Sequence, residues 1–593
     1  MKLTRRGFIK ASLASSVVFV SAGLQSCASN NDDDTPPVTA SFLHGVASGD
    51  PLIDSILLWT RVTPDTPTVE PIEIIWEVAS DANFDNLVNM DSGNTDVSRD
   101  YTLKVDVRGL TPGTRYYYRF TIGNTVSPVG KTQTLPSDNL DQVKIAVFSC
   151  SNYPTGYFNV YREATYEANL NAVLHLGDYI YEHQPGGYAR EQAEALGRQV
   201  EPDGECITLD DYRTRYAQYR TDENLQTLHA AFPWIVVWDD HEIANDAWRE
   251  GAQNHDDTEG SYDARKQASL QAYFEWLPLR PITADEDGRI YREFAYGDLV
   301  NLMMLDTRRI GRDEQLSYAN YISEQGEFDA SAFTTDVNSA DRTLLGETQR
   351  NWLLQTMNTS TARWQVLGQQ VLMGRMLLPA VTLNSLNPAV TLNEYTAVVR
   401  AASKYQTILQ ELARQGVTDP TTEQLLAAGM TEAELAIVND PNQLAWLESP
   451  FFPYNLDAWD GYAYDREVVL GAALAGRKNL ISLAGDTHNA WSSQLTDVSG
   501  TAVGTEFATS SVSSPGSETS LGLTTREAAK ISEAGLVQLI NDLQYCNLRE
   551  RGYMTVTFTQ ERAIARWIFV DTVLEQDYSV LTDAGKSLEV QAS

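Results

Sequence analysis

One arrangement recurs along most of the chain after residue 143: a short apolar run leads directly into small or metal-binding side chains. The clearest runs are residues 144–148, 172–176, 234–238, 299–305 and 479–483. Segments with helical spacing of apolar residues separate them, which is typical of a layered α/β domain. In open α/β sheets, ligands bind just beyond the carboxyl ends of the strands. The pattern therefore predicts an α/β domain with a composite site at that edge.

The residues that follow these runs are suited to cation binding. They are Ser149-Cys150, Gly177-Asp178, Asp239-Asp-His-Glu242, Asp306-Thr-Arg308 and Gly485-Asp-Thr-His488. Crowded carboxylates repel one another unless a cation compensates them. Asn245 and Asp246 add oxygen donors close to the second cluster, which favours a hard ion there. Tyr181 lies three residues after Asp178 and is a further candidate donor.

The segment before this domain has the pattern of an all-β unit. Residues 56–59, 72–78, 101–107 and 116–122 are strand-like runs separated by Pro, Gly, Asn and Asp. About 95 residues suit one sandwich, so we expect a fibronectin/Ig-like sandwich over residues 42–136 that serves as a scaffold. The α/β domain would then occupy residues 137–593, with a helical insertion at about 384–450. Residues 210–232 and 524–549 are expected to be helical.

The first residues indicate export. Arg5 and Arg6 precede an apolar run over residues 11–24 that is too short for a stable membrane span. This predicts a twin-arginine signal peptide over residues 1–27 and the twin-arginine export machinery as a partner. Cys27 ends a lipobox-like sequence, so the expected product is a periplasmic protein or a lipoprotein anchored to the cell envelope; ordinary cleavage by signal peptidase is the alternative. Residues 28–41 suit a flexible acidic linker.

The net charge limits the surfaces that this protein can bind, and the cysteine content limits its possible disulfides. A net charge of −36 disfavours a nucleic-acid or anionic-membrane surface. If the substrate is anionic, so acidic a protein would need bound metal ions to receive it. Cys206 and Cys546 are left over from the motifs, and in an oxidising compartment they either pair or stay free.

The motifs together resemble those of PhoD-like alkaline phosphatases, which are related to the purple acid phosphatases. The resemblance is carried by Phe148-Ser-Cys150, Gly177-Asp-Tyr-Ile-Tyr-Glu182, Trp238-Asp-Asp-His-Glu242, Asp457-Ala-Trp-Asp-Gly-Tyr462 and Gly485-Asp-Thr-His488. It implies an αββα-layered metallophosphoesterase domain behind the sandwich. Purple acid phosphatases carry Asp where this chain has Cys150, and a histidine near the position of Gln369-Gln370.

The resemblance also implies Fe³⁺ with Ca²⁺ beside it. The iron ligands would be Cys150, Asp178, Tyr181 and His488. Asp178 would bridge to calcium, which Asp240, Asn245 and Asp486 would also bind. Thiolate and phenolate stabilise ferric iron, whereas carboxylate and amide oxygens suit calcium.

The implied activity is hydrolysis of phosphomonoesters, phosphodiesters or both through a metal-bound hydroxide. His241 would protonate the leaving group, and Arg190 and Arg308 are candidate phosphate-binding residues. One alternative is a phospholipase D-like phosphodiesterase, which the same ligands would serve. A non-catalytic surface lipoprotein is the alternative outside enzymes.

Overall fold

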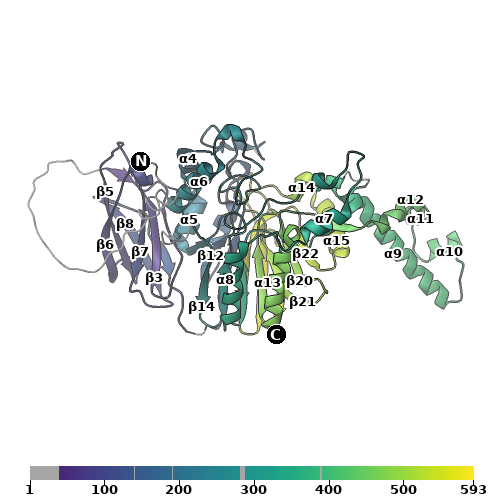
Figure 1. The fold of residues 1–593 in the computed structure, drawn as a ribbon. Helices are drawn as coiled ribbons and strands as arrows, with labels where there is room; N and C mark the ends of the chain where they lie inside the picture. Colours follow the sequence, from purple (N-terminus) through teal and green to yellow (C-terminus); the bar gives the residue numbers. More distant parts are fainter. Residues whose placement is uncertain (1–38, 139, 190, 281–287, 387–389, 593) are drawn as a thin grey trace, which may run out of the picture.

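The computed structural model describes residues 39–138, 140–189, 191–280, 288–386 and 390–592. The predicted signal peptide with Cys27, most of the predicted linker, and Arg190 lie outside these residues. Figure 1 shows three parts side by side: a β-sandwich, a central α/β body and a projecting helical arm. Within the described ranges, no helix is both long and apolar enough to cross a bilayer.

The sandwich has one sheet of its own, ordered β10-β8-β5-β6 with β9 paired to β8. These strands are β5 (Ile72–Ala79), β6 (Leu87–Thr95), β8 (Arg115–Ile122), β9 (Thr125–Val126) and β10 (Gly130–Gln133). Alternate residues of β5 and β8 face inward, as a sheet with one solvated face requires. Ile74, Trp76, Tyr118 and Phe120 are buried in the core beneath it.

The other sheet of the sandwich continues into the central α/β body, called the catalytic body below because the predicted site residues lie in it. Strands β2 (Val46–Gly49), β3 (Ser55–Arg61) and β7 (Thr102–Arg108) form one end of a nine-stranded sheet. β2 joins it by parallel pairing with β13 (Pro233–Val236). Side chains of β3 alternate between two cores, with Leu58 in the sandwich and Trp59 in the catalytic body. The two parts therefore share a sheet as well as a covalent connection.

Two mixed sheets face each other in the catalytic body. The nine-stranded sheet has the order β25-β24-β23-β11-β12-β13-β2-β3-β7, and the seven-stranded sheet has the order β14-β15-β16-β19-β21-β20-β22. The remaining strands of the nine-stranded sheet are β11 (Val143–Phe148), β12 (Ala172–His175), β23 (Arg551–Phe558), β24 (Arg562–Val570) and β25 (Lys586–Gln591). Those of the seven-stranded sheet are β14 (Arg292–Tyr296), β15 (Val300–Met304), β16 (Trp364–Gly368), β19 (Asn479–Ala484), β20 (Ala490–Thr496), β21 (Ala502–Ala508) and β22 (Leu543–Asn547).

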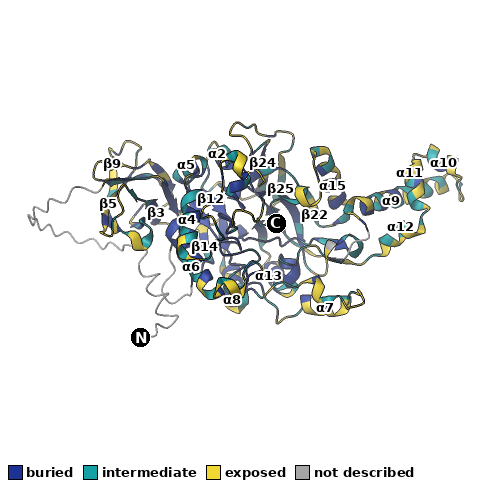
Figure 2. Ribbon diagram, turned by 90° about the horizontal axis from the view of Figure 1, so that it is seen from above, coloured by how far each residue is buried: buried dark blue, intermediate teal, exposed yellow. Residues whose placement is uncertain are grey.

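Apolar burial on both faces holds these layers together. In the seven-stranded sheet, Val366 and Ile481 pack into the core shared with the nine-stranded sheet. Leu367 and Leu480 instead pack outward with residues of α8 (Gly346–Thr359) and α13 (Ala463–Ala475). Helices α2 (Asn159–Ala164), α4 (Leu209–Tyr219), α5 (Glu223–Ala231) and α6 (Tyr262–Trp276) contribute to the first core. Figure 2 shows buried residues concentrated in this body. The predicted fold class, a β-sandwich followed by an α/β domain, is confirmed.

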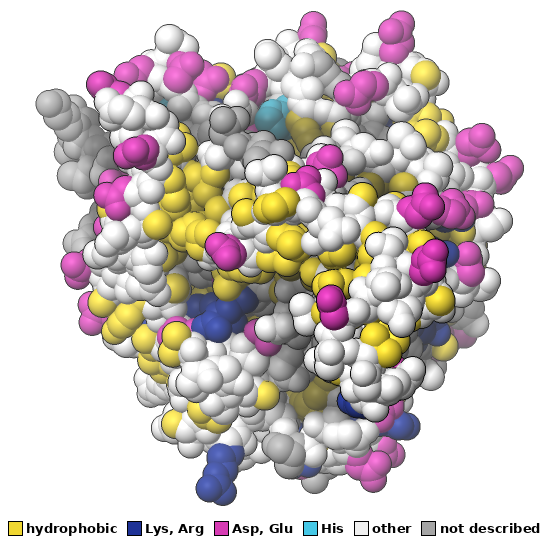
Figure 3. Space-filling model, turned by 90° about the vertical axis from the view of Figure 1, so that its right-hand side faces the viewer, with side chains coloured by type: hydrophobic (Ala, Val, Ile, Leu, Met, Phe, Trp, Pro, Cys, Tyr) yellow, Lys and Arg dark blue, Asp and Glu magenta, His cyan; other side chains and the backbone are white. Residues whose placement is uncertain are grey.

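A helical arm occupies the region of the predicted insertion. It consists of α9 (Leu392–Arg414), α10 (Thr422–Ala427), α11 (Glu432–Val438) and α12 (Pro441–Ala445). A capping box at Thr391 and Glu394 begins α9. The arm has a small core of its own around Leu425, Met430 and Leu435. Seen from this end, the surface carries scattered acidic side chains, while basic ones are few (Figure 3).

Asp50 provides a test of how firmly the sandwich is joined to the catalytic body. Its buried carboxylate accepts hydrogen bonds from Arg292 Nη2 at 2.6 Å and from the Arg280 backbone N–H at 2.8 Å. We expect Asp50→Asn to destabilise the protein by about 3 kcal/mol, because Arg292 loses its buried counter-charge. Asn tolerates the left-handed backbone found there (φ 44°), so backbone strain is not added.

The free energy of unfolding in urea measures the effect. The control is Glu589→Gln, whose exposed ion pair with Arg562 (3.0 Å) should contribute less than about 1 kcal/mol. Equal small losses in the two variants would contradict the role given to Asp50.

Candidate metal centre

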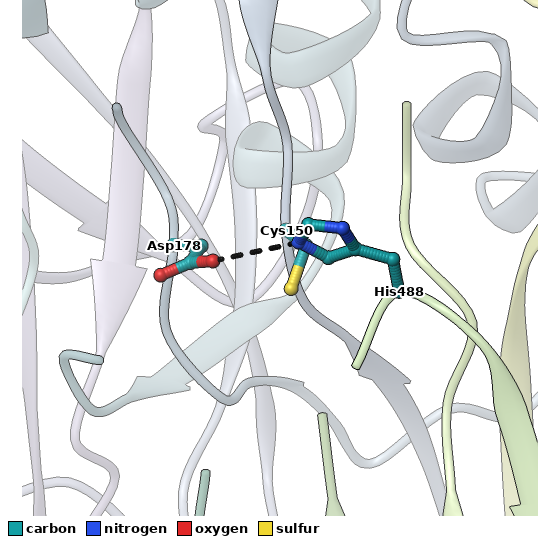
Figure 4. A group of neighbouring side chains, drawn as sticks. All are labelled: Cys150, Asp178 and His488. Carbon is teal, nitrogen blue, oxygen red and sulfur yellow. Dashed lines mark ion pairs between the residues drawn. The ribbon is translucent and has the colours of Figure 1, made fainter. Parts of the chain in front are cut away.

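Side chains that can bind metals converge where strands of the two sheets end. They form four groups, and within each group the ligand atoms lie within 4.8 Å of one another. The groups are Cys150/Asp178/His488, Asp178/Asp240/His241, Glu182/His183/His241 and Asp239/Asp240/Asp486. Because Asp178, Asp240 and His241 each belong to two groups, the four form one continuous site. Figure 4 shows Cys150, Asp178 and His488 pointing toward one another from separate loops.

The loops hold these residues in an uncommon backbone conformation. Cys150, Asp178, Asp486 and His488 all have positive φ, between 52° and 63°. For a residue other than glycine, this conformation raises the free energy of the folded state by about 1–2 kcal/mol, so the surrounding structure must enforce it. Gly177 allows the close approach that does so: a Cβ there would lie 2.4 Å from the backbone nitrogen of Asp239. Only glycine lets these two ligand loops meet.

Glu242 ties the same two loops together. Its carboxylate accepts hydrogen bonds from the backbone N–H groups of Asp178 (3.0 Å), Tyr179 (2.5 Å) and Asp239 (2.6 Å). It is buried, and its bonds go to both loops: two to the loop after β12 and one to the loop after β13. Glu242 thus stabilises the backbone that carries the candidate ligands.

The four residues predicted to bind iron lie together. The Tyr181 hydroxyl is 3.0 Å from Asp178 Oδ2 and 3.0 Å from His488 Nε2. Ser514 donates to the same hydroxyl at 2.7 Å. His488 Nδ1 lies 2.7 Å from the carbonyl oxygen of Pro515, so Nδ1 carries the proton and Nε2 is left to face the site. This tautomer is the one that a metal-binding histidine needs.

The chemistry of these donors fits a cation. Asp178 Oδ1 is buried and has no hydrogen-bond partner among the described residues. Burial, together with the Asp178 carboxylate, raises the pKa of the Cys150 thiol well above its ordinary value. A thiolate at this position therefore requires a positive charge beside it. A metal ion between Cys150, Asp178 and His488 would supply that charge. Asp178 Oδ2 faces Tyr181 and His488, so the orphaned Oδ1 would need a contact with a cation of its own.

Arg308 neutralises the carboxylates on the other side of the site. Its guanidinium is fully buried and donates to Asp239 through Nε, to Asp457 through Nη1 (2.7 Å) and to Asp486 through Nη2 (3.1 Å). Asp240 lies 3.6 Å from Nη2. These carboxylates accept from N–H groups of the Arg308 guanidinium that a phosphate would also use. Phosphate binding by Arg308 stays a prediction.

Two of the predicted calcium ligands, Asp240 and Asp486, lie on this side. Asp240 belongs to two of the four groups, which places it between the iron-type donors and Asp486. Burial and repulsion from Asp457 raise the pKa of Asp486 well above its usual range, so Arg308 alone does not compensate it. The third, Asn245, donates from its backbone N–H to Glu182 at 2.8 Å and from Nδ2 to Gln253 at 3.0 Å, so its part in a calcium site stays a prediction.

His241 faces the site with one ring nitrogen already engaged. Its Nδ1 lies 2.7 Å from Glu182 Oε2. Burial would lower the pKa of His241, but the carboxylates of Glu182, Asp178 and Asp240 outweigh it and raise that pKa well above the ordinary value. The predicted catalytic residue is thus next to the candidate metal ligands.

Several contributors were not predicted. Glu182, Glu242 and Asp457 stand inside the recognised motifs, but their partners are far away in the sequence. Ser514 belongs to a buried serine-rich loop after β21, and this run of serines is the one feature of the sequence that could have indicated it. Gln369 and Gln370 form structural bonds, for example from Gln370 Nε2 to the Trp238 carbonyl at 2.6 Å.

The suggested disulfide is absent. Cys206 and Cys546 are both free in the described chain. Cys206 is packed in the core shared by the two sheets, whereas Cys546 belongs to the core outside the seven-stranded sheet. The two thiols are therefore held apart by separate packing.

Comparisons with known proteins agree with this arrangement. Residues 145–567 match the family model described as PhoD-like phosphatase, and residues 26–136 match that of the PhoD-like phosphatase N-terminal domain. Alkaline phosphatase D of Bacillus subtilis (strain 168) is 33% identical over 557 residues, which is 92% of this chain and 80% of that protein. The solved structure titled "Structure of PhoD" aligns with a TM-score of 0.70 and 31% identity, covering 95% of this chain and 92% of that one.

Replacement of Arg308 tests its role as the internal cation. We expect Arg308→Met to destabilise metal-free protein by about 3–5 kcal/mol, because buried carboxylates lose their counter-charge. Urea unfolding in the presence of a strong chelator measures this loss. Arg562→Met, at an exposed ion pair, is the control and should change the free energy of unfolding by less than about 1 kcal/mol. A similar small change for Arg308→Met would refute the assignment.

Proposed function

Since the chain belongs to the PhoD-like phosphatase family, and is therefore a phosphoric ester hydrolase, we propose that it is a metal-dependent alkaline phosphatase that uses the site described above. One observation carries the proposal: Asp178, whose buried Oδ1 has no hydrogen-bond partner among the residues that the structure describes, stands between two donor sets of different chemistry. Membership of a phosphatase family argues against a non-catalytic surface lipoprotein.

The two donor sets suit two kinds of cation. Cys150, Tyr181 and His488 would hold Fe³⁺ together with Asp178, because thiolate and phenolate are anionic donors that stabilise ferric iron. Asp240, Asn245 and Asp486 would hold Ca²⁺, which prefers carboxylate and amide oxygens. When bound, such cations neutralise the charge that develops on the phosphoryl oxygens and make attack by water effective at moderate pH.

The protein's own groups complete the reaction. A water oxygen forms a bond to phosphorus while the bond from phosphorus to the ester oxygen breaks; one proton of that water stays on the phosphate product and the other is released to solvent, from which His241 is later reprotonated. His241 donates its Nε2 proton to the departing ester oxygen, which leaves as an alcohol. Glu242 holds the backbone that carries Asp178, and the surrounding structure enforces the positive φ of Cys150 and Asp178, so little reorganisation of the donors is needed.

We propose phosphomonoesters, phosphodiesters or both as substrates, with a phospholipase D-like phosphodiesterase as the alternative on the same site. Arg190 remains a candidate phosphate-binding residue. Export by the twin-arginine route rests on Arg5 and Arg6, and a lipid anchor rests on Cys27. Both place the enzyme outside the cytoplasmic membrane, as a periplasmic protein or an envelope lipoprotein.

Metal analysis combined with kinetics tests the function and the calcium assignment. Purified protein should contain iron and calcium and should hydrolyse a monoester, a diester or both. A calcium-selective chelator should abolish turnover, and added calcium should restore more of it than magnesium, because a flexible oxygen-rich site suits the larger ion. Full activity in calcium-free buffer would mean that a cation other than calcium occupies the site formed by Asp240, Asn245 and Asp486. Hydrolysis of diesters alone would favour the phosphodiesterase alternative.

Tyr181→Phe tests the iron assignment. If the phenolate binds ferric iron, the wild-type protein is coloured by charge transfer from the phenolate to the metal. The variant should lose or strongly shift that visible band and retain less iron, while its free energy of unfolding changes by less than about 1.5 kcal/mol, because a ring of nearly equal volume remains. Cys150→Ser is the matched control: it should weaken iron retention but keep the band. A colourless, zinc-containing and fully active wild-type protein would contradict the assignment.

A further inference from the structure

We propose that a cavity outside the metal centre binds a small oxyanion of the phosphate type. The cavity has a volume of about 220 Å³ and lies between helix α15 (Arg526–Leu539), strand β22 and the residues that lead into β25. Figure 2 shows these elements next to one another. The cavity shares no lining residue with the predicted metal site, so the inference does not depend on the proposed function.

Basic side chains reach the cavity from two of its walls. Arg526 and Lys530 are four residues apart on α15 and therefore lie on one face of the helix, and Lys586 is the first residue of β25. Lys530 and Lys586 are exposed, and they form no hydrogen bond or ion pair with any residue that the structure describes. Arg526 donates only through Nε, to Glu550 at 2.8 Å, which leaves both of its Nη groups without a partner in the described chain.

Tyr545 of β22 adds a buried donor to the third wall. Its hydroxyl is buried and has no hydrogen-bond partner among the described residues. Burial and the carboxylates of Glu533 and Glu550 raise the pKa of Tyr545, so the hydroxyl keeps its proton and can donate it. The ring packs against Trp567, with 5.0 Å between the ring centroids, which restricts where the hydroxyl points. A buried hydroxyl without a partner is unfavourable, so a ligand that accepts from it gains binding free energy.

The acidic side chains that line the cavity are already engaged, with one exception. Glu550 accepts from Arg526, and Glu533 accepts from the backbone N–H of Leu548 at 2.9 Å. Asp583 is the exception: it is exposed and has no such donor among the described residues. Its charge opposes an anion, but at an exposed position it is screened by water and salt.

The unsatisfied groups of the cavity are therefore mainly donors, and a ligand must bring acceptors. An oxyanion provides them, because a guanidinium, an ammonium and a hydroxyl each donate hydrogen bonds to anionic oxygens. These donors come from three separate elements, α15, β22 and β25. They suit a tetrahedral group with oxygens in several directions better than a planar carboxylate. The volume also leaves room for a short organic group on the phosphorus.

Equilibrium dialysis of the metal-loaded, full-length protein against radiolabelled inorganic phosphate tests the site. We expect two phosphate ions per chain, one at the metal centre and one in the cavity. Lys530→Gln combined with Lys586→Gln should weaken binding to the cavity by at least about tenfold, because two charged donors are lost, and should leave one ion per chain. Lys131→Gln, at an exposed position of β10, is the matched control and should leave both ions bound.

Two further variants test the sign of the charge and the role of the hydroxyl. Asp583→Asn should tighten phosphate binding in the cavity by about two- to fivefold, because it removes a negative charge from the lining. Tyr545→Phe should weaken binding by about three- to tenfold, since one donor is lost. Its melting temperature without phosphate should not fall, because the hydroxyl has no partner among the described residues in the empty cavity.

Propylphosphonate, which is not an ester and cannot be hydrolysed, distinguishes the two sources of the ligand. If it displaces the cavity-bound phosphate at a lower concentration than inorganic phosphate does, the ligand is a small organic phosphate. If it needs a higher concentration, the ligand is free phosphate, which the proposed reaction releases. Either result supports an oxyanion site.

Three results would overturn the inference: a single phosphate per chain that is lost when the metals are removed, an unchanged phosphate count in the double lysine variant, or weaker phosphate binding by Asp583→Asn. The last result would indicate a cation in the cavity. Failure of the enzyme to hydrolyse any ester would overturn the proposed function and leave this inference standing, because dialysis measures binding alone.

Discussion

Electrostatic repulsion among buried carboxylates is the constraint on which the rest of this structure depends. Asp178, Asp239 and Asp240 lie together at the ends of neighbouring strands, with almost no solvent to screen them. The negative charge is compensated differently on the two sides of the site. On one side Arg308 supplies a fixed positive charge, and on the other the thiol, phenol and imidazole donors leave Asp178 with an oxygen that no described residue satisfies.

The scaffold around the site is stiff because its parts share sheets and cores. Strand β3 contributes to the sandwich core with one set of side chains and to the catalytic core with the other. The buried Asp50 joins this strand system to Arg280 and Arg292 of the catalytic body. Strained backbone at the ligands persists only where neighbouring elements enforce it. The sandwich, predicted as a scaffold, is built into the same sheet that carries Cys150 and Asp178.

The spacing of apolar residues along single segments predicted most strands correctly. It failed where a hydrogen-bonding partner elsewhere in the chain decides the structure of a segment. Residues 210–232 were expected as one helix, but Asp222 accepts from the N–H groups of Asn224 and Leu225 and begins a new helix, α5. The expected helix over 524–549 ends at Leu539, and residues 543–547 form β22 by pairing with β20. Apolar periodicity describes one segment at a time, so it cannot show that a neighbouring strand offers hydrogen bonds.

The sequence by itself determined which residues would meet: Cys150, Asp178, Asp240, Asp486 and His488 all follow apolar runs, and carboxyl ends of strands in α/β layers gather at one edge. Only the tertiary structure decided how they are paired. Three features depend on contacts between positions that are distant in the sequence. Arg308 pairs with four carboxylates, Glu182 contacts His241, and Cys206 and Cys546 are buried in separate cores. Such contacts follow from the order of strands in two sheets and from the packing between them, and neither is encoded in any local stretch of residues.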